Sequence, residues 1–248
     1  MTWTKGRIAV AAATALAVAI AVAVMVKVER RRHSAWDVLR PDLALLQKTP
    51  PQVRLVPTKF VWGGGWVMDG DKMIGIGVQL RSIVQTAYRV PGARVVVATA
   101  LPPFRYDFIA NLKKGSLEAL QQEIKRETGV VARRETRETD VLVLTVRYAN
   151  GRDLKPSDET SSPQTQYQDG EYFWSHQPLS TLAQMLEQKL DSPVVDETNL
   201  AGDFDFHLKW NWRGSPDALK RDLSEQLGLA LAPARRSIEV LVIDRAHN

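Results

Sequence analysis

The sequence predicts an α+β protein in which one N-terminal transmembrane helix precedes two tandem repeated β-α-β-β-α-β-β modules. The first observation behind this prediction is an uncharged stretch of 19 residues at Ile8–Val26. The second is a set of matches between two later segments at an offset of 99 residues. The predicted divisions are an anchor with basic flanks (1–32), a connector (33–59), a first module (60–149), a linker (150–169) and a second module (170–248).

Charge is concentrated at the N-terminus. Residues 1–40 hold seven basic and two acidic side chains, which account for the whole net charge of +5. The other 208 residues hold 26 of each sign, so they offer no overall basic character for a nucleic-acid partner. The chain has no cysteine, which excludes disulfides, thiolate metal sites and cysteine nucleophiles.

The apolar stretch Ile8–Val26 is about 28 Å long as a helix, close to the roughly 30 Å of a bilayer core. A cleaved signal peptide, with Ala21–Ala23 as its cleavage site, is the alternative. The count of basic groups beside the helix slightly favours a cytoplasmic C-terminal part. The lipid bilayer is the first expected partner, contacted by basic residues that flank the helix: Lys5, Arg7, Lys27, Arg30, Arg31 and Arg32.

The repeat is clearest where Gly115–Leu120 aligns with Gly214–Leu219. Without a gap, the alignment continues to Asp140–Leu144 and Glu239–Ile243. Asp107 and Phe108 match Asp205 and Phe206 after a slip of one residue. Matches at nearly one offset indicate a tandem duplication.

Each repeat shows the same order of elements after an Asp-Gly pair. Ser116 and Ser215 are predicted to cap a helix that ends at Gly129 or Gly228. The predicted elements are helices at 80–89 and 179–190, buried strands at 94–99 and 193–197, an alternating strand at 204–212, helices at 117–128 and 216–227, and C-terminal β-hairpins whose last strands are 141–146 and 240–244.

The second repeat resembles a known family through Pro193–Trp210, Leu223–Leu231 and Val240–Asp244. This is a family of soil-bacterial proteins of unknown function, typically exported, whose domain is also appended to penicillin-sensing receptor metallopeptidases. The resemblance covers about residues 60–246 and implies no catalytic residues. More loosely, the modules are similar to the short N-terminal domains of secretins and TonB-dependent receptors, which dock on proteins. The apolar helix predicts a single-pass protein of the bacterial inner membrane. The exported habit of the family implies that the domain after this helix is periplasmic, and a cytoplasmic domain is the alternative.

No motif in the sequence predicts a catalytic residue, a cofactor or a metal site. His207 shares the polar face of its strand with Asp205 and Lys209, and we interpret this trio as a solvent-facing strand edge with cross-strand pairing. Asp107 and Asp205 are interpreted as structural acceptors of backbone N–H groups.

Aromatic and basic clusters give the candidate docking residues. Gly63–Gly65 and Gly75–Gly77 are predicted to form flexible turns, and Trp210 and Trp212 to pack in the core. The candidate docking residues lie beside the first glycine run and at a predicted hairpin tip: Trp62, Trp66, Arg133, Arg134 and Arg137.

The leading hypothesis is a non-enzymatic accessory or scaffolding subunit of a membrane complex, such as an energy-transducing or envelope assembly, whose modules dock on partner proteins. The alternative is an extracytoplasmic sensory domain that binds a small envelope molecule. An enzyme of unrecognised type, with Asp205 or His207 as a catalytic group, is the third hypothesis.

Overall fold

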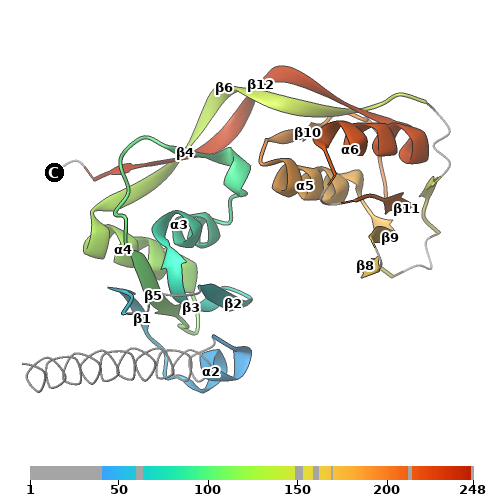
Figure 1. Ribbon diagram of the computed structural model, residues 1–248. Helices are drawn as coiled ribbons and strands as arrows, with labels where there is room; N and C mark the ends of the chain where they lie inside the picture. Colours follow the sequence, from blue (N-terminus) through green and yellow to red (C-terminus); the bar gives the residue numbers. More distant parts are fainter. Residues whose placement is uncertain are drawn as a thin grey trace, which may run out of the picture. The chain divides into compact units, whose positions relative to one another are not determined.

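The computed structural model describes residues 41–59, 64–148, 153–158, 162–168, 170–211 and 214–246 (Figure 1). These residues form a mixed α+β structure with three four-stranded sheets. The predicted helix at Ile8–Val26 lies outside the described residues. Within the described ranges, no helix has the length and apolar character needed to cross a membrane. The chain divides into one unit of residues up to Ile83 with Pro102–Gly129, and a second unit of Val84–Leu101 with the chain from Val130 onward.

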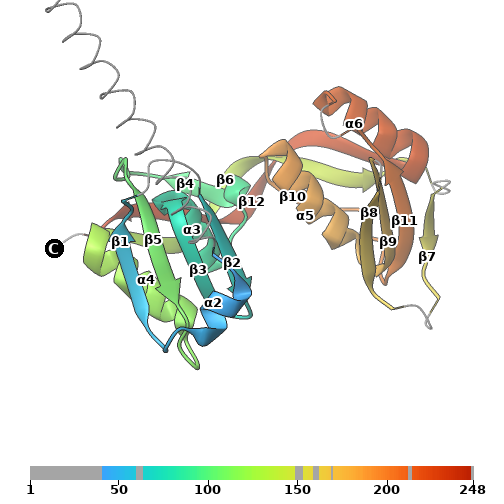
Figure 2. The same cartoon turned by 60° about the horizontal axis from the view of Figure 1, so that its bottom comes forward.

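The first unit contains an antiparallel sheet with the strand order β1-β5-β3-β2 (Figure 2). Its strands are β1 (Val53–Pro57), β2 (Gly65–Asp69), β3 (Lys72–Gln79) and β5 (Arg105–Ala110), and its helices are α2 (Leu43–Lys48) and α4 (Ser116–Thr128). Helix α4 packs against this sheet, and Leu55, Phe108 and Leu120 are buried in the core. Strand β1 and helix α2 lie in the segment predicted as a connector.

The glycines of β3 do not form the predicted turn. Gly75 lies inside the strand, where an added Cβ would collide with the ring of Phe108. Gly77 has a φ of 63°, and the register of β3 with β5 shifts between Gly75 and Val78. Gly75 therefore leaves room for the Phe108 ring, and Gly77 allows the positive φ of a β-bulge.

The second unit contains a sheet with the order β10-β6-β12-β4. Its strands are β4 (Val95–Val97), β6 (Val130–Val146), β10 (Val194–Asp196) and β12 (Leu229–Arg245). The two inner strands are antiparallel, and each outer strand is parallel to its neighbour. Helix α3 (Leu80–Tyr88) and a 3-10 turn at Gly92–Arg94 precede β4.

The register of this sheet is symmetric under the 99-residue offset. Glu138 of β6 lies opposite Ser237 of β12, and these two residues are themselves 99 positions apart. Exchanging equivalent residues of the two repeats therefore leaves the β6–β12 register unchanged. The outer strands follow the same rule, with the parallel pairs Val96–Val242 and Val195–Val143. This agreement supports the predicted duplication.

The prediction of a β-hairpin at the C-terminal end of each repeat is wrong. Residues 130–146 and 229–245 each form one continuous strand of 17 residues. The alternating charged stretch in the middle of β6 does not turn back on itself, because the equivalent stretch of β12 pairs with it along its whole length.

A third sheet, with the order β7-β11-β9-β8, completes the second unit (Figure 2). Its strands are β7 (Leu154–Pro156), β8 (Gln164–Gln168), β9 (Glu171–Gln177) and β11 (Phe204–Lys209). Strands β7 and β8 lie in the segment predicted as a linker, which is therefore partly structured. The apolar face of this sheet shares a core with α5 (Leu179–Leu190), α6 (Pro216–Asp222) and the π-helical turn Leu223–Leu227.

Helix ends agree only in part with the predicted caps. The Ser215 hydroxyl accepts a hydrogen bond from Ala218 N at 3.2 Å, as predicted. Gly115, with a φ of 70°, takes the N-cap position of α4 in place of Ser116, whose hydroxyl instead donates to Leu112 O. Gly129 and Gly228 end their helices in the left-handed conformation, as predicted.

Candidate functional site

Trp66 lies on β2, one of the two outer strands of the first sheet, and its side chain is 45% exposed. It lies beside a groove of about 540 Å³. The remaining lining residues come from the β2 start, the β3 bulge, the α3 start and β5: Gly64, Gly65, Gly77, Val78, Gln79, Ser82 and Arg105. Of the two tryptophans predicted to dock, Trp62 lies outside the described residues.

Two hydrogen bonds fix the backbone of Gly77, which lines this groove. Gly77 N donates to Asp107 Oδ1 at 2.8 Å, and Arg105 Nη1 donates to Gly77 O at 3.1 Å. A Cβ added to Gly64 would lie 2.5 Å from Gly77 O, so only glycine fits there. Trp66 is therefore presented beside a fixed backbone bulge.

The equivalent bulge in the third sheet is built around Asp205. Its Oδ1 accepts hydrogen bonds from His176 N at 2.8 Å, Ser157 Oγ at 2.7 Å and Ser175 Oγ at 3.0 Å. These bonds, above all the one from His176 N and then the one from Ser157, lower the pKa of Asp205. His176 has a φ of 51° and stands 99 residues after Gly77. The prediction that Asp107 and Asp205 are structural acceptors is confirmed.

The outer face of the third sheet carries an open pocket of about 430 Å³. In this pocket the rings of Phe173 and His207 stack with centroids 4.3 Å apart. Phe173 is 40% exposed, and Gln164 and Gln166 of β8 form the neighbouring rim. The face thus combines one accessible aromatic ring with amide side chains, which can donate and accept hydrogen bonds.

Charged side chains continue this face toward Glu171. His207 Nε2 lies 2.9 Å from Glu171 Oε2, and Lys209 Nζ lies 2.7 Å from Glu171 Oε1. Lys209 first, and then His207, lower the pKa of Glu171, and Glu171 raises the pKa of Lys209. The predicted cross-strand pairing is confirmed, but β11 is an inner strand, so the predicted edge position is wrong.

The arginines predicted to dock do not form a hairpin tip. They lie in the first half of β6, and alternation along the strand places Arg133 and Arg137 on one face and Arg134 on the other. Glu135 pairs with both Arg137, at 2.7 Å, and Arg133, and these contacts lower its pKa. Arg134 contacts Glu239 and donates to Tyr88 O.

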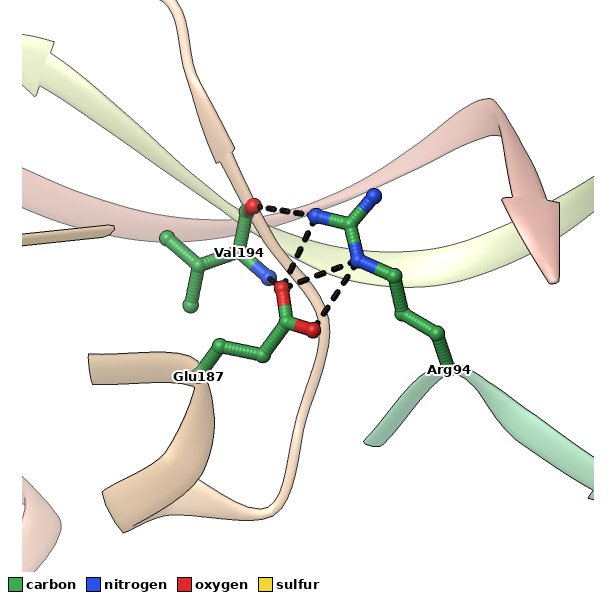
Figure 3. Close-up of polar contacts among 3 residues, drawn as sticks. All are labelled: Arg94, Glu187 and Val194. Atoms are coloured by element: carbon green, nitrogen blue, oxygen red, sulfur yellow. Dashed lines mark hydrogen bonds and ion pairs between the residues drawn. The ribbon is translucent and has the colours of Figure 1, made fainter. Parts of the chain in front are cut away.

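An ion pair between Arg94 and the buried Glu187 connects α5 to β10 in the second unit (Figure 3). Glu187 is 2% exposed, and its Oε2 accepts from Arg94 Nη2 at 2.8 Å and from Val194 N at 3.0 Å. Arg94 also donates to Val194 O at 3.0 Å. Both carboxylate oxygens of Glu187, and Nε and Nη2 of Arg94, have a partner within this contact, which marks the pair as a support for β10.

Of the remaining residues singled out in the sequence, one lies in the core and the others lie outside the described residues. Trp210 is 5% exposed and packs in the core as predicted, whereas Trp212 lies outside the described residues. The membrane-flanking residues are also outside them: Lys5, Arg7, Lys27, Arg30, Arg31 and Arg32. Among the described residues, no group of three or more His, Asp or Glu is placed to hold a metal ion.

Strand β8 is not among the elements that the sequence predicts. Its residues Gln164–Gln168 alternate between glutamine and Thr165 or Tyr167. That alternation is the period of a strand, but the surrounding polar stretch resembles a linker.

The described residues therefore define a mixed α+β protein with three four-stranded sheets. A family model for a protein of unknown function, DUF3738, matches residues 81–246. The chain therefore belongs to this family. Comparison with the curated proteins and with the solved structures gave no match.

Proposed function

We propose that this protein is a non-enzymatic, single-pass membrane protein whose α+β modules dock on partner proteins, as an accessory subunit of a membrane complex of the bacterial envelope. The observation that carries the proposal is Trp66, an exposed tryptophan on an outer strand beside a groove. Tryptophan is enriched among residues that dominate binding energy at protein interfaces.

The rigidity of the groove adds support. Asp107 and Arg105 hold both backbone groups of Gly77, and Gly64 has no space for a side chain. A preformed surface loses little conformational entropy when a partner binds. The arginines of β6 add less support, because Arg133, Arg134 and Arg137 already form ion pairs within the chain.

The test is purification of the full chain from its native membrane in mild detergent, followed by native mass measurement. A partner should co-purify with the wild type, and Trp66→Ala should lose it without lowering the melting temperature. Phe104→Ala is the matched control, since Phe104 is 63% exposed in the same unit but does not line the groove. A wild-type monomer with no co-purifying protein would contradict the proposal.

A second function, binding of a small envelope molecule by a periplasmic sensory domain, is favoured by the pocket on the third sheet. The exposed ring of Phe173 beside Gln164 and Gln166 suits a ligand with apolar and hydrogen-bonding faces. A thermal-shift screen against cell-wall fragments and β-lactams tests it. A hit should disappear in Phe173→Ala, and the absence of any hit counts against this function.

A further inference from the structure

Strand β8 is an outer strand without the features that normally prevent pairing with another chain. All five of its residues are exposed, none is charged, none is proline, and its register with β9 contains no bulge. Natural sheets usually protect their edges with charges, prolines, bulges or very short strands. An unprotected edge of this kind is a template for strand addition.

The other outer strands carry such protection. Strand β7, at the opposite edge of the same sheet, contains Lys155 and Pro156 (Figure 2). Strand β1 contains Arg54 and Pro57, and β2 ends at Asp69. Strands β4 and β10 have three residues each. Among the described outer strands, β8 therefore stands apart.

The sequence of β8 is complementary to itself. In an antiparallel pair of two copies centred on Gln166, Gln166 lies opposite its own copy and Gln164 lies opposite Gln168. Thr165 then lies opposite Tyr167 of the other copy, an aromatic and β-branched pair that stabilises sheets. No like charges meet anywhere in the five-residue overlap.

The two faces of β8 suit this arrangement. The three glutamines lie on the outer face of the sheet, next to Phe173, where their amides can both donate and accept hydrogen bonds across the axis. On the other face, Tyr167 is 53% exposed and its ring centroid lies 4.6 Å from that of Tyr172. A second copy would cover this accessible ring.

We propose that β8 is a homodimer interface, in which two copies of the chain pair antiparallel about a two-fold axis at Gln166 and join their third sheets into one eight-stranded sheet. The ends of that sheet would be the two β7 strands, whose Lys155 and Pro156 stop further addition. The assembly therefore stops at two copies of the chain. This inference goes beyond the docking function, which uses Trp66 in the other unit.

Single cysteines test the register, because the chain contains none of its own. At the axis, Gln166→Cys places two Cα atoms about 4.5–5.5 Å apart, within the range that a disulfide spans. Gln164→Cys alone places them about 14 Å apart, so it should not cross-link, whereas Gln164→Cys combined with Gln168→Cys should. Gln184→Cys, on an exposed position of α5, is the matched control.

The experiment uses the full chain in detergent micelles under mild oxidation. The proposal predicts a doubled mass on a non-reducing gel for Gln166→Cys and for the double variant, and single-chain mass for Gln164→Cys and Gln184→Cys. Equal cross-linking of all four variants, or none in Gln166→Cys, would overturn it.

A charge variant tests the unmodified protein. Gln166→Lys places two positive charges opposite each other at the axis, so sedimentation should show a loss of the dimer, while Gln184→Lys keeps it. Equal melting temperatures of the two variants show that the fold is intact. A dimer that survives Gln166→Lys overturns the proposal. The proposal is also wrong if the wild type is a monomer and Gln166→Cys cross-links to a different protein. Loss of docking in Trp66→Ala leaves this result unaffected.

Discussion

Arg94 and Glu187 form a bidentate ion pair across 93 residues of sequence, with Arg94 Nε 2.9 Å from Glu187 Oε1 and Arg94 Nη2 2.8 Å from Glu187 Oε2 (Figure 3). The arginine belongs to the first repeat and the glutamate to the second, and both lie in the second unit. The same carboxylate accepts from Val194 N at the start of β10. One side chain thus links α5, β10 and the turn before β4.

Removing the charge of Glu187 should destabilise the second unit strongly. Glu187→Gln leaves Arg94 without its counter-ion in a contact where the glutamate is 2% exposed, so we expect a loss of about 3 kcal/mol in the free energy of unfolding. Urea denaturation measures this. The matched control is Glu197→Gln, whose pair with Arg236 is exposed and should cost less than about 1 kcal/mol. Equal losses in the two variants would contradict the assigned role.

Adding one methyl group to β3 should test the contact between Gly75 and Phe108. Gly75→Ala forces its Cβ into the Phe108 ring, and overpacking of this kind costs about 1–3 kcal/mol. Gly65→Ala is the control, because the nearest atom to a Cβ there is 3.9 Å away, on Pro41. Thermal unfolding should show a clearly lower melting temperature only for Gly75→Ala. A neutral Gly75→Ala would mean that the ring moves aside without cost.

The carboxylate of Asp205 should make stability depend on pH. Its pKa is lowered in the folded protein, so its contribution is present above the unfolded pKa of about 4 and is lost as pH falls through the folded pKa. Asp205→Asn should therefore be less stable than wild type at pH 7. The difference should shrink below about pH 4, as followed by denaturant unfolding at a series of pH values. A difference independent of pH would contradict a role for the charge.

The centre of the β6–β12 ladder should respond to charge at position 237. Ser237 lies directly opposite Glu138, and both side chains are exposed. Ser237→Lys should raise the free energy of unfolding and Ser237→Glu should lower it, with each change below about 1 kcal/mol. Chemical denaturation of the two variants side by side measures the sign. The reverse order would show that the register differs.

Much of the repeat was predictable from local sequence. Helix α5 has the predicted bounds, Leu179–Leu190, and the alternation from Phe204 onward correctly predicts β11. The slip of one residue that aligns Asp107 with Asp205 is also seen in the structure, where both carboxylates accept from the residue at the bulge. These features depend on neighbouring residues, which periodicity and capping reveal.

The candidate sites were less predictable. The sequence indicates Trp66 as a candidate docking residue beside a glycine run, but its groove depends on Gly77 and Arg105, which come from other strands. Strand β8 has the composition of a linker and becomes a strand through pairing with β9. Polar segments of this kind gain their structure from a neighbour, which no local pattern identifies.

The order of the central helices and strands, the similarity between segments 99 residues apart, and the concentration of positive charge around one apolar stretch can be read from the sequence alone. These are properties of local periodicity and of similarity between segments. The strand partner at the end of each repeat becomes visible only in the folded chain. Residues 130–146 of one repeat pair with 229–245 of the other, instead of folding back as a hairpin. Strands pair through backbone hydrogen bonds, which can join residues distant in the sequence. The equivalent strand of the other repeat offers the same antiparallel hydrogen-bond pattern that a local hairpin would offer, so the sequence alone does not distinguish the two.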